Sequence, residues 1–321
     1  MKVLVAGSTG ALGAPTVREL VTRGHEVYGL TRSEAKAESI ERAGAHAVLG
    51  DVLDAVAMER VASSVAPEGV IQLLNAIPKR GVMRPSELDA TNELRTTGTR
   101  HLLEAALRHG ARRYVVESMI FGYGYGDRGQ ALLTEEAPFG EPIVGKQMLP
   151  ALKALTDMEE MVLEPTKRGE FEAIVLRLGL FYGPGVGSTE FMISLLRKHL
   201  MFLPGGGKGL LSWIHVEDGA RACVDALERA TAGSVFNVVD DRPAGFGDMV
   251  AELSRALDLP GPKSIPAAVV KPVSSYAVLM ANTNIRASNA RIKRELGWAP
   301  LYPTIEEGTR SIAEERGPAG A

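Results

Sequence analysis

The chain has 321 residues, 45% of them hydrophobic, and 36 basic against 39 acidic residues give a formal net charge of −3. The hydrophobic content excludes bulk disorder, and the near-neutral charge argues against nucleic acid as a partner, because phosphate binding needs clustered positive charge. The single cysteine, Cys223, excludes a disulfide framework within the chain, and no cluster of His, Asp or Glu has the spacing of metal ligands. No apolar run approaches the length of a membrane span. We therefore expect a cytoplasmic protein without a metal or a membrane partner.

Short apolar runs alternate with amphipathic segments through the first half of the chain. The expected strands are Val3–Ala6, Glu26–Leu30, Ala47–Leu49, Val70–Leu74, Tyr114–Val116 and Ala173–Leu178. The expected helices are Ala14–Arg23, Ala35–Ala43, Ala55–Val65, Glu93–His109 and Leu149–Leu163. Alternation of this kind predicts an α/β fold with a doubly wound parallel sheet, the Rossmann arrangement, covered by helices on both faces.

The pattern changes after Gly183. We expect helices at Phe191–His199, Asp218–Ala230, Phe246–Leu257 and Asn289–Leu296, strands at Trp213–Val216 and Val235–Val239, and a glycine-rich loop at Phe202–Gly209. These elements predict a smaller, interleaved C-terminal α+β substrate lobe. We assign residues 1–184 and 213–240 to a dinucleotide-binding domain, and residues 185–212 and 241–321 to the substrate-binding lobe.

A glycine-rich turn connects the first expected strand to the first expected helix. It consists of Gly7, Ser8, Thr9, Gly10, Ala11, Leu12 and Gly13 and fits the pattern G-x-x-G-x-x-G. Gly7 permits a tight turn, Gly10 lets a pyrophosphate approach the backbone, and Gly13 permits close packing of helix and strand. The helix N-terminus adds free N–H groups and a positive dipole end. The turn predicts a dinucleotide cofactor.

The residues after the second expected strand indicate which dinucleotide binds. NAD-binding proteins carry an acidic residue there for the ribose 2′-hydroxyl, whereas this chain has Thr31 and Arg32. An arginine can pair with a 2′-phosphate in bidentate fashion, and Lys36 lies one helical turn further on. We predict that NADP(H) is preferred and that NAD(H) is possible. Asn75 and Ala76, which follow the run Val70–Leu74, are also assigned to the cofactor site.

Several further motifs resemble those of the short-chain dehydrogenases/reductases, in the extended or atypical NAD-dependent epimerase/dehydratase group. They are Gly50-Asp51-Val52, Asn92 with Gly98-Thr99 at a wider gap than usual, Leu176–Leu178 with Phe181–Gly185, Trp213–Asp218, and Asn289–Leu296 with Gly297–Pro300. The resemblance covers nearly the whole chain. It implies that Asp51 and Val52 contact the adenine.

The usual catalytic set of this family is Ser or Thr, Tyr-x-x-x-Lys and a helix Asn, in which Tyr donates the proton. No tyrosine of this chain has a lysine four residues later. Lys153 is present, but Leu149 stands where the tyrosine is expected, so the standard proton relay cannot run from that position. We predict that Lys153 binds ribose hydroxyls.

The serine position is altered as well. In the segment Glu117-Ser118-Met119-Ile120-Phe121-Gly122, strict alignment puts Glu117 at the serine position and Ser118 one residue late. A one-residue slip turns a side chain to the other face of a sheet. Tyr123 and Tyr125 follow in a glycine-rich loop, and we predict Tyr123 with Ser118 as the relocated acid. Glu117 is either a structural hydrogen-bond partner or an acid/base with a raised pKa.

The main hypothesis is an NADP(H)-dependent oxidoreductase that reduces a carbonyl or a conjugated alkene with a non-standard proton donor. Asn92, Ser118, Tyr123 and Lys153 are the polar groups expected near the reacting atoms. Leu211 stands where nucleotide-sugar enzymes of the family carry an arginine, and nearby segments are apolar, so we expect a moderately apolar small-molecule substrate.

Two alternatives stay open from the sequence. One is a cofactor-retaining epimerase, dehydratase or isomerase with Glu117 as acid/base, and the other is an NADP-sensing regulatory protein without catalysis. A homodimer paired through the long helices Glu93–His109 and Leu149–Leu163 is also expected.

Overall fold

The computed structural model describes residues 1–141, 143 and 145–317. Seven parallel strands form its central sheet, in the order β11-β6-β5-β4-β1-β2-β3. These strands are β1 (Lys2–Ala6), β2 (Glu26–Thr31), β3 (His46–Leu49), β4 (Gly69–Gln72), β5 (Arg113–Met119), β6 (Glu172–Leu178) and β11 (Val235–Val238). Shorter strands are β7 (Leu180–Tyr182), β8 (Phe202–Pro204), β9 (Leu210–Leu211), β10 (Trp213–His215), β12 (Ala244–Gly245) and β13 (Lys263–Ile265).

Thirteen α-helices are described, together with short 3₁₀ and π segments. The helices are α1 (Gly13–Thr22), α2 (Glu34–Arg42), α3 (Ala55–Val65), α4 (Asp89–Glu93), α5 (Thr99–Arg108), α6 (Leu149–Lys167), α7 (Gly187–Arg197), α8 (Val216–Arg229), α9 (Phe246–Ala256), α10 (Ala267–Val270), α11 (Ser275–Ala281), α12 (Ala290–Leu296) and α13 (Ile305–Arg316). The 3₁₀ segments are η1 (Pro85–Leu88), η3 (Ile120–Tyr123) and η4 (Lys146–Met148), and η2 (Leu94–Gly98) is a π-helical turn.

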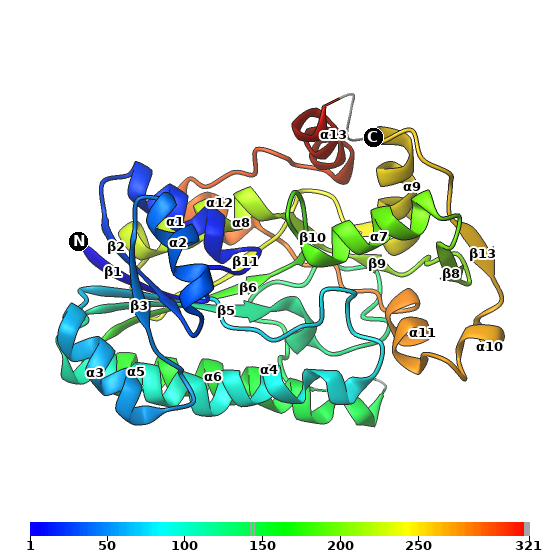
Figure 1. Ribbon diagram of the computed structural model, residues 1–321. Coiled ribbons are helices and arrows are strands. Elements are labelled where there is room, and N and C mark those ends of the chain that lie inside the picture. The colour runs from blue at the N-terminus through cyan, green and yellow to red at the C-terminus, as the bar shows by residue number, and fades with distance from the viewer. Residues whose placement is uncertain (142, 144, 318–321) are drawn as a thin grey trace.

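The sheet lies between two helical layers (Figure 1). Helices α3, α5 and α6 cover one face, and α1, α2, α8 and α12 cover the other. Along β1, Leu4 and Ala6 pack toward the first layer, and Val3 and Val5 pack toward the second. The strand is apolar at every position because both of its faces are buried. The predicted doubly wound fold is therefore confirmed.

The structure corrects two of the expected elements. The single helix expected at Glu93–His109 is divided into α4, the π-helical turn η2 and α5. The segment Phe202–Gly209, expected to be a glycine-rich loop, begins with the strand β8, which pairs with β13. Apolar residues that recur every three to four positions indicate a helical segment. They do not reveal where one turn of the helix contains an extra residue, as the π-helical turn η2 does.

The C-terminal part of the chain is woven into the rest. Helices α7, α9, α10 and α11 lie beyond one end of the sheet (Figure 1). The segment after them returns to the core, where Trp298 is 1% exposed and its indole N–H donates to the Asp218 carbonyl at 3.3 Å. The Asp218 carboxylate accepts backbone N–H groups of Leu301 and Tyr302 at 2.7 and 2.9 Å. Residues of the predicted substrate lobe therefore also stabilise the sheet domain.

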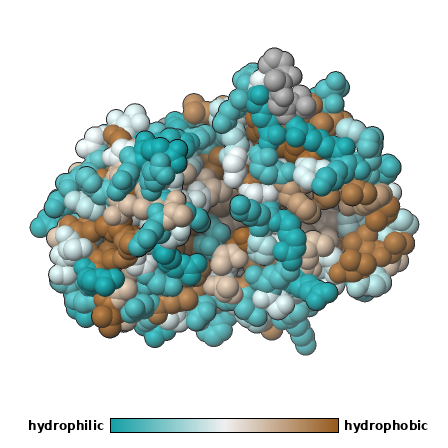
Figure 2. All heavy atoms as spheres, viewed as in Figure 1, coloured by the Kyte–Doolittle hydropathy of each residue, from teal (hydrophilic) through white to brown (hydrophobic). Residues whose placement is uncertain are grey.

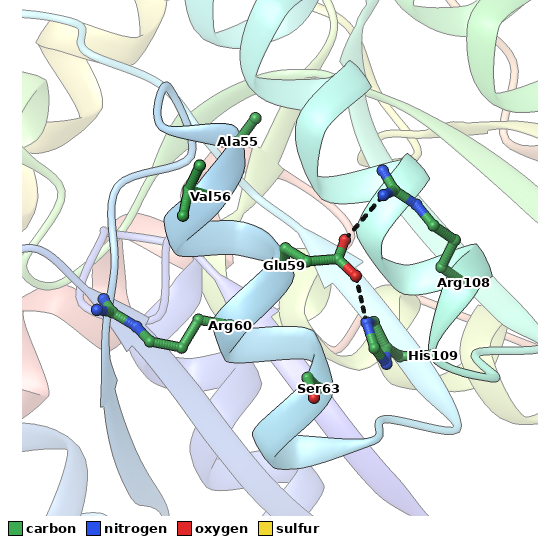
Figure 3. Close-up of a pocket in the computed structure, with 7 residues that line it drawn as sticks. All are labelled: Ala55, Val56, Glu59, Arg60, Ser63, Arg108 and His109. Atoms are coloured by element: carbon green, nitrogen blue, oxygen red, sulfur yellow. Dashed lines mark hydrogen bonds and ion pairs between the residues drawn. The ribbon is translucent and has the colours of Figure 1, made fainter.

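A shallow hollow lies between α3 and α5, on the outer side of the helical layer (Figure 3). Glu59 of α3 pairs there with Arg108 at 3.2 Å and with His109 at 2.6 Å. None of the predicted site residues lines this hollow. Its ion pairs connect the two helices, which is a structural role.

Candidate active site

The glycine turn follows β1 at the point where the strand order reverses, next to β4. Gly7 has a φ of +90°, and a Cβ atom there would lie 2.4 Å from the Leu73 carbonyl oxygen. A Cβ atom on Gly13 would lie 2.0 Å from the Gly7 carbonyl oxygen. Both positions therefore require glycine. Gly10 is exposed, and its Cβ would come no closer than 3.1 Å to any other atom, so its outer side is open to a ligand.

The other residues of the turn hold its shape: the Gly10 N–H donates to the Gly7 carbonyl at 2.9 Å, and α1 begins without a side-chain cap. The Ser8 hydroxyl donates to the Leu30 carbonyl of β2 at 3.0 Å, so this side chain is used within the protein. Leu12, at the start of α1, is buried and provides no side-chain cap. Ala11 is exposed and Thr9 half-buried. An uncapped helix N-terminus behind an open glycine fits a pyrophosphate.

The residues expected around the adenosine lie at the ends of β2 and β3. The Arg32 guanidinium is 68% exposed and lies 3.5 Å from the Asp51 carboxylate. Asp51 also accepts the Leu53 N–H at 3.0 Å, which orders this loop. Thr31 is buried and its hydroxyl contacts Ser33, whereas Val52 belongs to the core. Arg32 is therefore exposed beside Asp51 at the expected adenosine end, while Thr31 and Val52 shape the loop from inside.

Asn75 and Ala76 lie on the exposed segment after β4. The Ala76 N–H donates to the buried Thr91 hydroxyl at 3.0 Å, which ties this segment to α4. The segment lies beside the glycine turn, because Leu73 is the residue that contacts Gly7. Together these residues fit a dinucleotide that extends along the carboxyl edge of the sheet.

Glu117 and Ser118 lie at the end of β5 and point to opposite faces. Strand β5 pairs with β6 in continuous register from Arg113 to Met119, so no bulge changes the alternation. The Ser118 hydroxyl donates to the Glu159 carboxylate of α6 at 2.6 Å. Glu117 points to the other face, toward Cys223 in α8, whose pKa is raised mainly by burial and further by the Glu117 carboxylate. The two side chains therefore cannot act on one substrate atom.

Ser118 and Tyr123 belong to a buried network that also contains Glu159, Arg177 and Asn237. Arg177 donates to Glu159 at 2.7 Å and to the Tyr123 hydroxyl at 3.1 Å. The Tyr123 hydroxyl donates to the Asn237 side-chain oxygen at 2.8 Å. Ser118 and Tyr123 are both 0% exposed. Their hydroxyls are occupied by internal partners, so the expected relocated acid, Tyr123 with Ser118, is not available in this structure.

The Tyr123→Phe variant tests this structural role. We expect its free energy of unfolding to fall by about 1–2 kcal/mol, because Asn237 loses a buried hydrogen-bond partner. We expect the turnover rate to stay within about threefold. Urea denaturation and NADPH oxidation kinetics measure the two quantities. A rate loss of about 100-fold with unchanged stability would restore Tyr123 as the proton donor.

Lys153 lies on the outer side of α6. Its side chain is 74% exposed and its ammonium pairs with Asp157 at 2.7 Å. Leu149 is also exposed, at 41%. The buried residues of α6 are Ala151, Leu152, Ala154, Leu155, Met158, Glu159, Val162 and Pro165, and they include neither tyrosine nor lysine. The structure thus does not bring Lys153 to the interior, where a ribose contact was expected, because the helix turns this position toward solvent.

Sequence reasoning missed Arg95, which lies on the π-helical turn. Its side chain is 6% exposed, and Glu117, Tyr125 and Tyr276 lie close enough to stabilise its charge. Arg95 lies three residues before Gly98, inside the segment between Asn92 and Gly98-Thr99 that is wider than usual for the family. That spacing was a usable signal. Asn92, the residue predicted as the family's helix Asn, lies half-buried in α4, and its side-chain oxygen has no hydrogen-bond partner among the described residues.

Burial raises the pKa of Glu117 to about 7, although Arg95 opposes the shift. One carboxylate oxygen of Glu117 has no hydrogen-bond partner in the described part of the chain. The Tyr125 ring stacks on Phe121 at 5.1 Å and meets the Tyr276 ring edge-on at 6.4 Å. Arg95, Glu117, Tyr125 and Tyr276, here called the Arg95 cluster, therefore join the end of β5 to α11 of the C-terminal part.

The surface is hollowed near the middle of the face shown in Figure 2, between the β1–α2 region and the α7–α11 region. The apolar segments expected to line the substrate site are partly core. Met192, Leu196 and Leu203 are buried, whereas Leu200 and Phe202 are about half exposed, at 52% and 43%. Trp213 and His215 lie buried in β10. No described helix is long and apolar enough to cross a membrane.

A family model described as the NAD dependent epimerase/dehydratase family matches residues 3–239. The chain belongs to this family. It is therefore an NAD(P)-dependent enzyme of the epimerase, dehydratase and reductase kind, and its cofactor is a nicotinamide dinucleotide. Among its relatives is a "3-diazoavenalumate denitrifying reductase" from Streptomyces sp, 34% identical over 311 residues, which covers 96% of this chain and 99% of the relative.

Two solved structures share the fold. UDP-glucose 4-epimerase from Thermotoga maritima, solved with UDP-glucose, has a TM-score of 0.80 and 22% identity and covers 98% of each chain. The human epimerase family protein SDR39U1, solved with NADPH, has a TM-score of 0.76 and 21% identity and also covers 98% of each chain. At these identities the two structures bear on the fold alone.

Proposed function

We propose that the protein is an NADPH-dependent reductase that removes the diazo group from an aromatic small molecule. The observation that carries the proposal is the loss of the tyrosine proton relay. The buried face of α6 is without tyrosine and lysine, and the Tyr123 hydroxyl is held by Asn237 and Arg177. A site built this way suits a substrate that accepts a hydride without receiving a proton. The 34% identical Streptomyces reductase, whose name specifies a diazo substrate, supports the same chemistry.

Such a reaction needs no proton donor to balance its atoms and charges. Bound NADPH supplies a hydride. In an arenediazonium ion the carbon–nitrogen bond breaks, its electron pair leaves with N₂, and the hydride forms the new carbon–hydrogen bond. The substrate is reduced, the cofactor is oxidised, and no proton enters. The protein has to position the ring and exclude water, which the buried aromatic residues Phe121 and Tyr125 at the end of β5 can do.

In this proposal, Arg32 is the residue that makes the protein prefer NADPH over NADH. We expect Arg32→Ala to weaken NADPH binding by about 10–100-fold, because a charge-assisted hydrogen bond to the 2′-phosphate is lost. NADH binding should change less than about threefold. Fluorescence titration with both cofactors measures this difference. Arg42→Ala, an equally exposed change on α2, is the control, and equal losses for NADPH and NADH in Arg32→Ala would contradict the assignment.

The reaction itself is tested with 3-carboxybenzenediazonium and NADPH that carries deuterium at nicotinamide C4. We expect enzyme-dependent oxidation at 340 nm, release of N₂, and deuterium at the ring carbon that held nitrogen. Mixtures without enzyme give the spontaneous rate. Product without deuterium, or no acceleration over that rate, would contradict the proposal. Conversion of a substrate without cofactor oxidation would instead favour an epimerase, and cofactor binding without any turnover a sensor.

A second candidate is reduction of a carbonyl or conjugated alkene with Glu117 as the proton donor. It is supported by the pKa of Glu117, which burial raises to about 7, and by its unpartnered carboxylate oxygen. The Glu117→Gln variant separates the two candidates. It should abolish reduction of a carbonyl substrate and leave reduction of a diazonium substrate largely intact.

A further inference from the structure

The charge of Arg95 is unusual among the buried arginines of this protein. Arg177 is equally buried, but it has an ion pair with Glu159 and further bonds to Tyr123 and the Glu135 carbonyl. Arg95 is 6% exposed as a whole residue, and its guanidinium has no hydrogen bond and no ion pair within 4.0 Å in residues 1–141, 143 and 145–317. A largely buried charge without a partner destabilises the folded protein. Such a group persists in a protein when a ligand supplies its partner.

The surroundings of Arg95 favour an anionic partner. The carboxyl group that acts on its charge, Glu117, makes no ion pair with it among the described residues and is itself buried, so it compensates the guanidinium only in part. The other neighbours are the phenols of Tyr276, which donates a hydrogen bond to Tyr125, and of Tyr125, whose own O–H can donate to a ligand. A guanidinium with five N–H donors beside two phenols matches the two oxygens of a carboxylate. The stacked rings of Phe121 and Tyr125 add an aromatic wall.

We propose that Arg95, with Tyr125 and Tyr276, binds the carboxylate of an aromatic substrate at the junction between β5 and α11. This inference rests on the proposed function and names its substrate class. The cofactor's phosphates have a separate place at the glycine turn and Arg32, so the anion at Arg95 is the substrate's own. The π-helical turn η2 carries Arg95 into this position.

Binding without turnover tests the anchor. The probes are 4-hydroxycinnamate and its methyl ester, titrated by calorimetry into the NADP⁺ complex. Arg95→Met should weaken binding of the carboxylate at least tenfold and leave the affinities for the ester and for NADP⁺ unchanged. Arg100→Met, an exposed change on α5, should bind both probes like the wild type. If the wild type does not bind the carboxylate, or Arg95→Met binds it equally well, the proposal is overturned.

A stability measurement separates an anchor from a structural residue. With its unpaired buried charge removed, the Arg95→Met apoprotein should melt a few degrees higher than the wild type, and 4-hydroxycinnamate should no longer raise its melting temperature. A lower melting temperature with unchanged carboxylate affinity would make Arg95 structural. Arg95→Gln, which keeps polar contacts, is the second variant if the first fails to fold. These readouts need no hydride transfer, so the anchor can hold even if the diazonium reaction fails.

Discussion

At pH 8 the Glu117→Gln variant is expected to be more stable than the wild-type protein, by as much as about 3 kcal/mol. Burial raises the pKa of Glu117 from its usual 4.5 to about 7. At pH 8 the folded protein must therefore hold a buried charge that the unfolded chain holds in water. Each unit of pKa shift corresponds to about 1.4 kcal/mol, and glutamine removes the charge while keeping the shape.

The raised pKa of Glu117 determines whether the stability of the wild type rises or falls with pH. Between pH 4.5 and 7 the folded protein binds more protons at Glu117 than the unfolded chain does, so the wild type loses stability as the pH rises through this range. Urea denaturation of both proteins at pH 5, 6, 7 and 8 should show a difference that grows with pH and levels off above 7. Glu160→Gln, an exposed change on α6, should show no such growth. A constant difference would mean that Glu117 is ionised throughout.

The Gly13→Ala variant is expected to lose about 100-fold or more in NADPH affinity and about 3 kcal/mol or more in stability. Its new methyl group would lie 2.0 Å from the Gly7 carbonyl oxygen, and backbone rather than a flexible side chain has to move. That movement opens the turn and tilts the start of α1, where the pyrophosphate is expected.

Substitutions at two other glycines serve as controls for this prediction. Gly10→Ala places a methyl group 3.1 Å from the Gly7 oxygen and on the open side of the turn, so we expect stability within about 1 kcal/mol and about tenfold weaker NADPH binding. Gly261→Ala has nothing within 4 Å of its new methyl group and should change neither quantity. Thermal melting and fluorescence titration measure both. An unchanged NADPH affinity in Gly13→Ala would remove the turn from the cofactor site.

The buried hydrogen-bond network around Arg177 could not be predicted from the sequence pattern. In the sequence, Ser118 and Tyr123 look like a relocated catalytic pair, because they lie close to the strand end where the family's catalytic residues are expected. In the structure the Ser118 and Tyr123 hydroxyls bond to Glu159 and Asn237, which come from α6 and β11. Neither partner is near in sequence, so local reasoning could not separate a structural hydroxyl from a catalytic one.

The sheet and the glycine turn could be predicted from the sequence, because both depend on local requirements. A buried parallel strand must be apolar on both faces, and the turn tolerates no Cβ at Gly7 or Gly13. Tertiary packing sets the faces that Glu117 and Ser118 occupy, since these depend on the register of β5 against β6. It also turns Lys153 toward solvent and encloses Arg95 with Tyr276. Burial of a charge is set by the elements that pack over it, and α11 comes from far along the chain.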